Sequence, residues 1–303
     1  MRSLTSIDLP ESFAENVTLV CGSRGETWLR ELPKLVSILE EKWTIKAGPS
    51  FANLSYNYVA PVVRADGTDA VLKLGLPVDD EEFDGETAYL RYLNGDGVVR
   101  LIDEEPDARA LLLERASEGR DLRQSFFSDP SAGVNAAIGL LRRLVRKPPA
   151  STTGFVMLEN WTAKLQEVDE WDFPKGYASK ASNIFGSAAA SEKYLLHGDF
   201  HHENILSSDT QGFLAIDPKG VIGDIKYDIA VFLNNHRAWL NAAPDLKEQL
   251  DSAVRGFANA FSIPEEEIRR WAFAQKVLGA FWTCTENGPR WRGQLTSADI
   301  WGI

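Results

Sequence analysis

Two polar motifs separated by a short loop constrain this chain more than any other part of its sequence. The first reads LHGDFHHENIL from Leu196 to Leu206, and the second reads LAIDPKG from Leu214 to Gly220. Asp217 follows an apolar run, as a carboxylate at a strand terminus does. The motifs therefore predict a site in which two carboxylates and one carboxamide come together.

The residue types of these motifs suit transfer of a phosphoryl group from ATP and Mg²⁺ to an alcohol. Such transfer depends on positioning, on neutralising phosphate charge with metal ions and on orienting the attacking hydroxyl. In the spacing His197-x-Asp199-x4-Asn204, Asp199 can accept the hydroxyl proton and Asn204 can offer a neutral oxygen to Mg²⁺. Asp217 adds an anionic oxygen, and hard oxygen ligands are those that Mg²⁺ prefers. We predict Asp199, Asn204 and Asp217 as catalytic residues, the last two as metal ligands.

Together with Lys73 and Glu86 upstream, the motifs resemble the aminoglycoside phosphotransferase branch of the protein-kinase-like fold. Their residues are most similar to the streptomycin 6-phosphotransferase and hydroxyurea kinase group. The resemblance extends from about Phe51 to the last helices and is specific between His197 and Asp228. It implies an α+β fold of two lobes, with a small antiparallel-sheet N-terminal lobe and a mostly helical C-terminal lobe.

The resemblance also implies a nucleotide site. In kinase-like folds, a strand lysine binds the α- and β-phosphates and is held by a glutamate of the next helix. Lys73 and Glu86 match these positions. Without the downstream motifs, the same two residues would suggest an ordinary solvated ion pair. No glycine lies between Gly48 and Gly67, so a glycine-rich phosphate loop is missing. The remaining residues expected near ATP are Ser55 and Asn57 in that loop, and Glu114 and Ala116 at the adenine edge.

For the acceptor, the resemblance points to the C-terminal helices and to the segment after Asp217. We expect Asp224, Trp282 and Glu286 to contact a cationic acceptor through ion pairs and cation–π contacts. Asp228 opens a helix, so we expect it either to cap that helix or to hydrogen-bond the backbone of the catalytic loop, the loop that carries Asp199 and Asn204. His197 is expected to brace the same loop. The neighbouring His201 and His202 would also suit a metallohydrolase, but the chain offers few further histidine ligands.

Composition narrows the possible partners. The 303 residues include 44 acidic and 32 basic side chains, a formal charge of −12, which argues against nucleic acids and anionic membranes and favours a cationic small molecule. The two cysteines have no paired spacing. We find no signal peptide or membrane span and expect a cytoplasmic protein, monomeric or weakly dimeric.

Hydrophobic periodicity predicts a strand-rich part over 1–116 and a helical part over 117–303. The resemblance implies that the first is a nucleotide-binding lobe and the second a catalytic and acceptor-binding lobe. The N-terminal elements are expected to be a helix over 27–43, a hairpin of 57–63 with 69–74, a helix ending near Leu93, and strands over 98–103 and 108–114. The later helices are expected over 136–145, 156–168, 229–240, 246–261 and 265–282.

The predicted activity is ATP-dependent phosphorylation of an aminoglycoside such as streptomycin. One alternative is a kinase for another small hydroxyl compound, hydroxyurea included, because the nucleotide machinery would be the same. Another is a nucleotide-binding pseudokinase, which the missing glycine-rich loop favours and the intact set of Lys73, Glu86, Asp199, Asn204 and Asp217 opposes.

Overall fold

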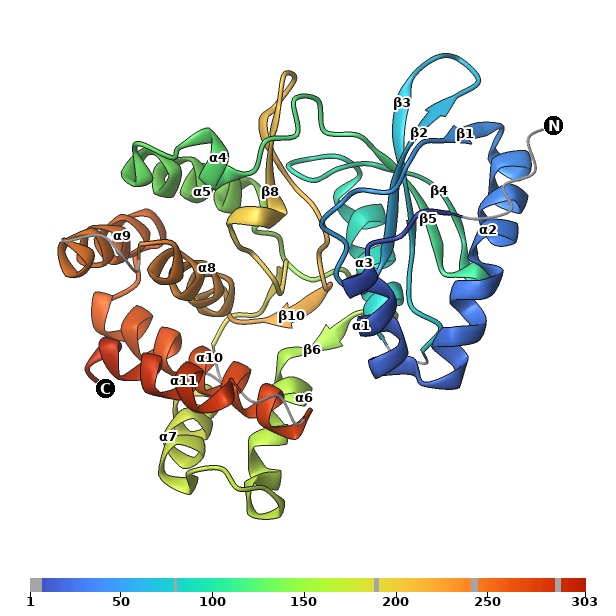
Figure 1. Ribbon diagram of the computed structural model, residues 1–303. Helices are drawn as coiled ribbons and strands as arrows, with labels where there is room; N and C mark the ends of the chain where they lie inside the picture. The colour runs from blue at the N-terminus through green and yellow to red at the C-terminus, as the bar shows by residue number, and fades with distance from the viewer. Residues whose placement is uncertain (1–6, 79–80, 188–190, 241–244, 287–289) are drawn as a thin grey trace. The chain divides into compact units, whose positions relative to one another are not determined.

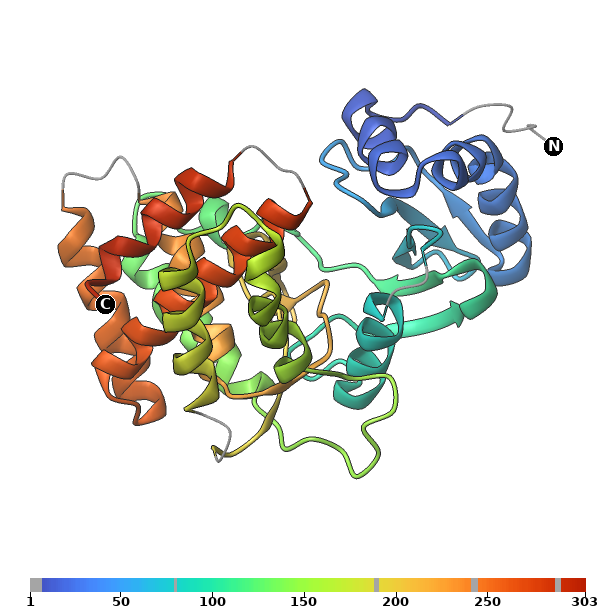
Figure 2. The same cartoon turned by 90° about the horizontal axis from the view of Figure 1, so that it is seen from below.

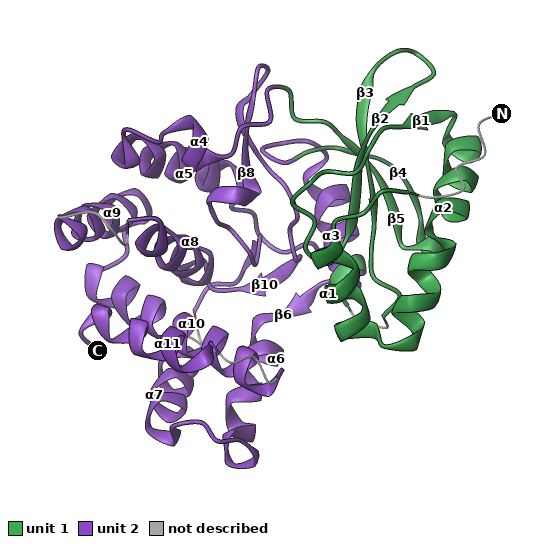
Figure 3. Cartoon of the chain, in the orientation of Figure 1, with its two compact units in different colours: residues 1–83, 99–117 green, residues 84–98, 118–303 purple. Residues whose placement is uncertain are grey.

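A computed structural model describes residues 7–78, 81–187, 191–240, 245–286 and 290–303. The chain divides into two compact units, which Figure 3 colours separately: residues 1–83 with 99–117, and residues 84–98 with 118–303. The segment 84–98 thus belongs to the second unit although it precedes the predicted boundary at 116/117. The first unit is built around a sheet and the second is mainly helical (Figure 1).

The sheet of the first unit has five antiparallel strands in the order β1-β2-β3-β5-β4. They are β1 (Ile45–Ala47), β2 (Tyr58–Arg64), β3 (Asp69–Leu74), β4 (Leu101–Glu105) and β5 (Ala110–Glu114). The predicted β2–β3 hairpin is confirmed: Gly67 has φ 83° and the Thr68 N–H donates to Asp66 Oδ1 at 3.0 Å. The glycine is required here because a side chain would strain this backbone conformation.

Two N-terminal helices pack on this sheet: α1 (Glu11–Cys21) and α2 (Ser23–Trp43). Figure 2 shows both, in blue, beside the strands. Phe13 and Val17 of α1 and Leu32, Val36 and Leu39 of α2 form one buried cluster with sheet residues. The apolar spacing of α2 predicts this burial, whereas α1 was not predicted.

The helix α3 (Glu82–Leu93) follows, and most of it belongs to the second unit. It ends at Asn94 and Gly95, both with positive φ, which is a common way to stop a helix. The two strands predicted after α3 are both present. However, β4 begins at Leu101 and β5 at Ala110, later than expected, and the 3₁₀ turn η1 (Pro106–Ala108) lies between them.

The second unit holds most of the helices (Figure 1). The α-helices after α3 are α4 (Leu122–Ser125), α5 (Pro130–Leu144), α6 (Leu158–Ala163), α7 (Lys175–Gly186), α8 (Lys226–Trp239), α9 (Leu246–Phe261), α10 (Glu265–Thr285) and α11 (Trp291–Thr296). The same unit also contains the 3₁₀ segments η2 (Lys164–Glu170), η3 (His202–Asn204) and η4 (Ser297–Trp301). The central helix α10 packs against α7, α8 and α11 and buries residues such as Trp271, Phe273 and Phe281.

Two small sheets position the polar motifs. One has the order β6-β10-β7, from β6 (Val156–Met157), β10 (Val221–Gly223) and β7 (Tyr194–Leu196), and the other is the hairpin of β8 (Ile205–Ser208) with β9 (Gly212–Ala215). The single helix predicted over 156–168 is wrong: Val156 pairs in parallel with Val221, and a helix begins only at Leu158. A short apolar run fits the pattern of a strand and of a helix equally well, and here pairing with β10 makes Val156 and Met157 a strand.

None of the helices built from described residues is long and apolar enough to cross a membrane.

Candidate active site

The two polar motifs lie side by side on loops that follow β7 and precede β10. These strands are antiparallel partners, with Leu196 opposite Val221. Two backbone hydrogen bonds join the loops: Lys219 N–H donates to the His197 carbonyl at 2.7 Å, and Ile216 N–H donates to the Asn204 carbonyl at 3.0 Å. Backbone hydrogen bonds therefore hold the two motifs at a fixed spacing without help from side chains.

Asp199 and Asn204 are hydrogen-bonded to each other. The amide Nδ2 of Asn204 donates to the Asp199 carbonyl oxygen at 3.0 Å and to its Oδ2 at 3.2 Å. His201 Nε2 lies 3.5 Å from the same carboxylate. Burial alone would raise the pKa of Asp199, but the hydrogen bond with His201, the charge of that imidazole and the charge of Lys219 outweigh it, so the pKa is lowered. Asp199 is therefore ionised near neutral pH.

His197 links the two loops through both of its ring nitrogens. Nε2 lies 2.9 Å from the Ile216 carbonyl, and Nδ1 accepts the Asp199 N–H at 3.2 Å. A carbonyl only accepts and an N–H only donates, so the proton sits on Nε2. Burial lowers the pKa of His197 to about 4 and keeps it neutral. The expected bracing role is thus confirmed.

Asp228, in the first turn of α8, holds the start of the catalytic loop. Its two carboxylate oxygens accept the backbone N–H groups of His197 and Gly198, each at 2.8 Å. The expected contact with the loop backbone is confirmed. Burial raises the pKa of Asp228 to about 7, against the lowering effect of these two hydrogen bonds. Tyr89 of α3 packs edge-on against the His197 ring, with centroids 6.0 Å apart.

Asp217 and Lys219 stand on the second loop. Asp217 has a positive φ of 57°, a conformation that aspartate tolerates better than most residues. Lys219 Nζ lies 3.5 Å from Asp217 Oδ2, and 19% of the lysine side chain and 31% of the aspartate side chain are exposed. This loop therefore offers one carboxylate and one cation, both partly accessible.

Helix α3 approaches the second loop at a pair of glycines. A Cβ atom on Gly220 would lie 2.1 Å from the Gly85 carbonyl oxygen, and one on Gly85 would lie 2.3 Å from the Lys219 carbonyl oxygen. Neither position has room for a side chain. Glu86, the next residue of α3, is buried. Lys73 is buried in β3 of the first unit, and its pairing with Glu86 stays a prediction.

The residues predicted around the nucleotide all belong to the first unit apart from Glu86. Ser55 is exposed, and its carbonyl accepts a bond from Asn16 Nδ2 at 3.1 Å; Asn57 is half-buried beside β2. Glu114 ends β5, and its carboxylate accepts the Arg100 N–H at 3.0 Å, with Ala116 following the strand. Contacts of these residues with ATP remain a prediction.

Of the residues predicted for the acceptor, Trp282 lies near the catalytic loop. Its ring meets Trp161 edge-on at 5.6 Å, and Trp161 in turn lies 5.9 Å from the Tyr227 ring. Trp161 Cη2 would lie 3.4 Å from a Cβ on Gly198, the neighbour of Asp199. Trp161 was not predicted from the sequence, because its isolated place on a six-residue helix carries no periodic signal.

The other two predicted acceptor residues are placed differently. Asp224 is buried, and its Oδ2 lies 3.0 Å from Lys226 Nζ while its Oδ1 accepts the Lys226 N–H at 3.0 Å. Lys226 also pairs with Glu267 at 3.2 Å. The charge of Asp224 is therefore balanced within the unit. Glu286 is exposed just after α10, and its role stays a prediction.

The adjacent histidines do not form a metal cluster in the part of the chain that the structure describes. His202 is fully buried and turns towards α8, where its Nε2 lies 3.1 Å from His236 Nδ1. Its ring also stacks on Phe232 at 4.3 Å. The imidazole of His202 thus fastens η3 to α8 and points away from a shared site with Asp199.

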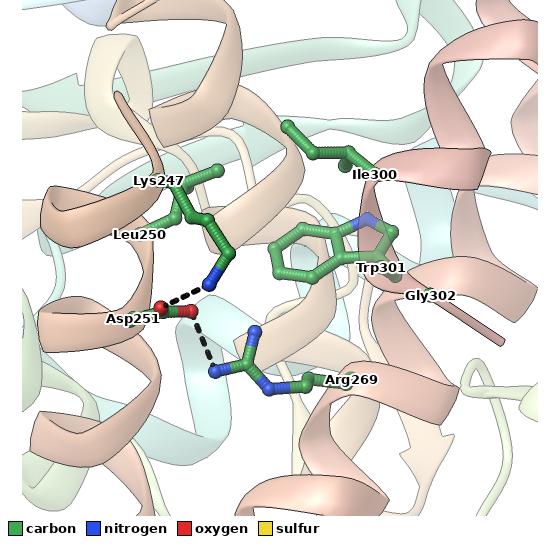
Figure 4. A pocket seen from close by; sticks show the side chains of 7 residues that line it. All are labelled: Lys247, Leu250, Asp251, Arg269, Ile300, Trp301 and Gly302. Atoms are coloured by element: carbon green, nitrogen blue, oxygen red, sulfur yellow. Dashed lines mark hydrogen bonds and ion pairs between the residues drawn. The ribbon is translucent and has the colours of Figure 1, made fainter. Parts of the chain in front are cut away.

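A cavity of about 380 Å³ lies elsewhere in the second unit. Figure 4 shows its lining, in which Asp251 pairs with Lys247 at 2.9 Å and with Arg269 at 2.8 Å beside Trp301. It contains none of the predicted site residues, and its charges already pair with one another. The candidate active site is therefore the pair of loops.

The chain is similar in sequence to known kinases. A family model described as aminoglycoside/hydroxyurea antibiotic resistance kinase matches residues 42–288. The chain belongs to this family. It is 31% identical over 291 residues to streptomycin 6-kinase of Streptomyces glaucescens, covering 93% of this chain and 92% of that protein. It is also 31% identical over 287 residues to hydroxyurea phosphotransferase of Kitasatospora aureofaciens, covering 91% and 80%.

Among solved structures, choline kinase LicA from Streptococcus pneumoniae matches with a TM-score of 0.62 at 13% identity, over 89% of this chain and 99% of that one. This likeness confirms the predicted protein-kinase-like α+β fold. As a member of the aminoglycoside/hydroxyurea antibiotic resistance kinase family, the chain is a phosphotransferase with a hydroxyl group as acceptor, and kinase chemistry of this kind uses ATP. The pseudokinase alternative is thereby set aside.

Proposed function

We propose that this kinase transfers the γ-phosphoryl group of ATP to a hydroxyl of an aminoglycoside such as streptomycin, and so inactivates the antibiotic. The observation that carries the proposal is the assembly of Asp199, Asn204 and Asp217 on two loops joined by backbone hydrogen bonds. We assign nucleotide binding to residues 1–116 and acceptor binding to residues 117–303. We also propose that the protein is cytoplasmic and is a monomer or a weak dimer.

Asp199 is the residue that receives the proton of the acceptor hydroxyl. Its lowered pKa keeps the carboxylate ionised, and 36% of its side-chain surface is exposed, so a hydroxyl can reach it. Asn204 and His201 hold the carboxylate in a fixed orientation, which favours a productive geometry. A general base of this kind contributes about 10²–10⁴-fold to the rate.

The donor set of the loops fits Mg²⁺. Asn204 uses Nδ2 for both bonds to Asp199, so Oδ1 is the amide atom that a cation would meet. Asp217 adds a partly exposed carboxylate. Mg²⁺ commonly takes one or two protein oxygens and completes its shell with phosphates and water, and when bound it would neutralise phosphate charge. Lys73 with Glu86 would hold the α- and β-phosphates, with Ser55, Asn57, Glu114 and Ala116 near the rest of the nucleotide.

A cationic acceptor is favoured by the aromatic residues beside the base. Trp161 reaches the backbone next to Asp199, and Trp282 packs on it, so both rings can meet a guanidinium or ammonium group. The chain is also strongly acidic, with a formal charge of −12. These features support an aminoglycoside acceptor, with Glu286 and Trp282 as acceptor contacts.

A second candidate is a small uncharged acceptor such as hydroxyurea. The specific observation in its favour is the pairing of Asp224 with Lys226, which removes one of the anions expected to bind a cationic sugar. The two relatives named above are both 31% identical to this chain, so overall identity does not choose between the acceptors.

The test is incubation of the purified protein with ATP, Mg²⁺ and, separately, streptomycin, other aminoglycosides and hydroxyurea, followed by mass spectrometry. A gain of one phosphoryl group on streptomycin is expected. Asp199→Asn should lose transfer by about 10²–10⁴-fold and still bind nucleotide, whereas Glu203→Gln, an exposed neighbour in the same loop, should keep activity. Phosphorylation of hydroxyurea alone would select the second candidate, and full activity of Asp199→Asn would remove Asp199 from the mechanism.

A further inference from the structure

We propose that Lys219 is a further catalytic residue, the cation that stabilises the phosphoryl group during transfer. The proposal rests on the proposed function and names a participant that the motif spacing alone does not reveal. It is carried by the ion pair of the lysine with the predicted metal ligand Asp217 and by its backbone hydrogen bond to the loop that holds the predicted base.

The side chain of Lys219 lies beside one carboxylate of the site, and its charge acts on a second. Its Nζ lies 3.5 Å from Asp217 Oδ2, and its positive charge also acts on Asp199, whose pKa it lowers. One cation therefore contacts the residue assigned to the metal and influences the residue assigned to the proton. A group in this position is close to where the transferred phosphoryl oxygens must pass.

The main chain of Lys219 is held on two sides. Its N–H donates to the His197 carbonyl at 2.7 Å, and its carbonyl abuts Gly85, where an added Cβ would come within 2.3 Å. Its Cβ would lie 3.0 Å from a Cβ on Gly198. Because the backbone is fixed against both the catalytic loop and α3, the fold sets where the side chain starts, and the contact of Nζ with Asp217 holds the charge beside the site before substrate arrives.

The catalytic loop supplies no permanent cation of its own. Between Asp199 and Asn204 it carries Phe200, His201, His202 and Glu203. A transition state with charge spread over three phosphoryl oxygens is stabilised by fixed positive groups. Lys219 provides such a group from the neighbouring loop.

The step balances without any covalent role for the lysine. The acceptor oxygen forms a bond to the γ-phosphorus as the bond from that phosphorus to the ADP oxygen breaks, and the hydroxyl proton passes to Asp199. Lys219 stays protonated and donates hydrogen bonds to the non-bridging oxygens. Asp217 would then bind the metal ion instead of pairing with Lys219.

The test compares Lys219→Met, Lys219→Gln and Lys219→Arg with Lys193→Met. Lys193 is the matched control, since it also pairs with a carboxylate of the same unit, Glu159 at 2.6 Å, on the surface. For each variant, kcat, both KM values, the nucleotide Kd from calorimetry and the slow ATP hydrolysis without acceptor are measured, and thermal melting checks folding.

We expect Lys219→Met and Lys219→Gln to lower kcat by roughly 10²–10³-fold. ATP hydrolysis should fall in parallel and the nucleotide Kd should stay nearly unchanged, while Lys219→Arg recovers part of the rate and Lys193→Met behaves as wild type. A kcat close to wild type, or a loss confined to either KM, would overturn the proposal. If the wild-type protein phosphorylates no aminoglycoside, the proposed function fails; the hydrolysis assay still decides the role of Lys219, which is overturned if hydrolysis survives its removal.

Discussion

At the level of single residues, the two predicted metal ligands differ in charge and should differ in the effect of their removal. Asp217→Ala deletes an anionic oxygen beside phosphates that remain charged, so Mg²⁺-dependent ATP binding and turnover should be lost together. Asn204→Ala should be milder, because water can partly replace a neutral ligand. Titration of Mg²⁺ in activity and calorimetry measures both, and a larger loss of metal affinity in Asn204→Ala would reverse the assignment.

Single residues also show how far the sequence could be read. The motifs of Asp199, Asn204 and Asp217 predicted that these residues come together, and two loops joined by backbone hydrogen bonds carry all three; their catalytic roles stay predictions. The pairing of Asp224 with Lys226 could not be predicted, since the sequence does not show which charges a fold neutralises. Trp161 was missed for a similar reason: only the tertiary fold brings it to Gly198.

At the level of elements, the contact of α3 with the second loop depends on the absence of a side chain at Gly85. Gly85→Ala would force a Cβ to within 2.3 Å of the Lys219 carbonyl oxygen, so α3 or the loop must move. We expect lower thermal stability and a lower kcat. Gly279→Ala in α10 is the control, because its Cβ meets nothing within 4 Å, and it should stabilise the protein by about 0.5–1 kcal/mol. An unchanged kcat in Gly85→Ala would show that this contact does not position the loop.

The contact between η3 and α8 gives a second prediction, on pH. Burial lowers the pKa of His202 and lowers that of His236 to about 4, so both are neutral when folded. The unfolded chain takes up these protons near its ordinary histidine pKa, so stability falls as the pH drops from about 6.5 towards 4. Asp228, with a pKa raised to about 7, opposes this trend by holding a proton in the folded state.

Replacing His236 isolates its share of this pH dependence. His236→Gln keeps a hydrogen-bonding partner for His202 but removes one titrating group. The slope of unfolding free energy against pH should therefore decrease by up to about 1.4 kcal/mol per pH unit. Chemical denaturation at several pH values measures this slope, and equal slopes in the two proteins would contradict the prediction.

Elements with strong periodicity were predicted well from the sequence. The helix α9 was predicted with its observed bounds, Leu246–Phe261, because its apolar residues recur on one face. The segment 156–168 was mistaken for one helix because the parallel pairing of Val156 with Val221 joins residues far apart in the chain. The sequence around Val156 gives no sign of a strand partner so far away in the chain.

At the level of the whole molecule, the acidic character of the chain predicts electrostatic capture of a cationic acceptor. The formal charge is −12, and the screening length shortens to about 10 Å at 0.1 M salt. Added salt should therefore raise the KM for the acceptor more than the KM for ATP, which relies on direct contacts. Steady-state kinetics across a salt series measures both constants. An acceptor KM that does not change with salt would favour an uncharged acceptor such as hydroxyurea.

The fold class could be predicted because the order of elements and the motifs agree: strands interrupted by one α-helix follow the N-terminal helices, and helices dominate the remainder. The acceptor could not be predicted to the same extent. The contacts that we propose for it come from α6, α10 and the catalytic loop, and net charge alone does not locate them.

The hydrogen bond from His197 to the Ile216 carbonyl has a spectroscopic consequence. The chain has four histidines, and three of them, His197, His202 and His236, are buried. The Nε2 proton of His197 lies in a 2.9 Å hydrogen bond shielded from solvent, so it should exchange slowly and give a separate imidazole resonance in nuclear magnetic resonance spectra. Because this proton joins the two loops of the site, its chemical shift should follow their arrangement as nucleotide and acceptor are added.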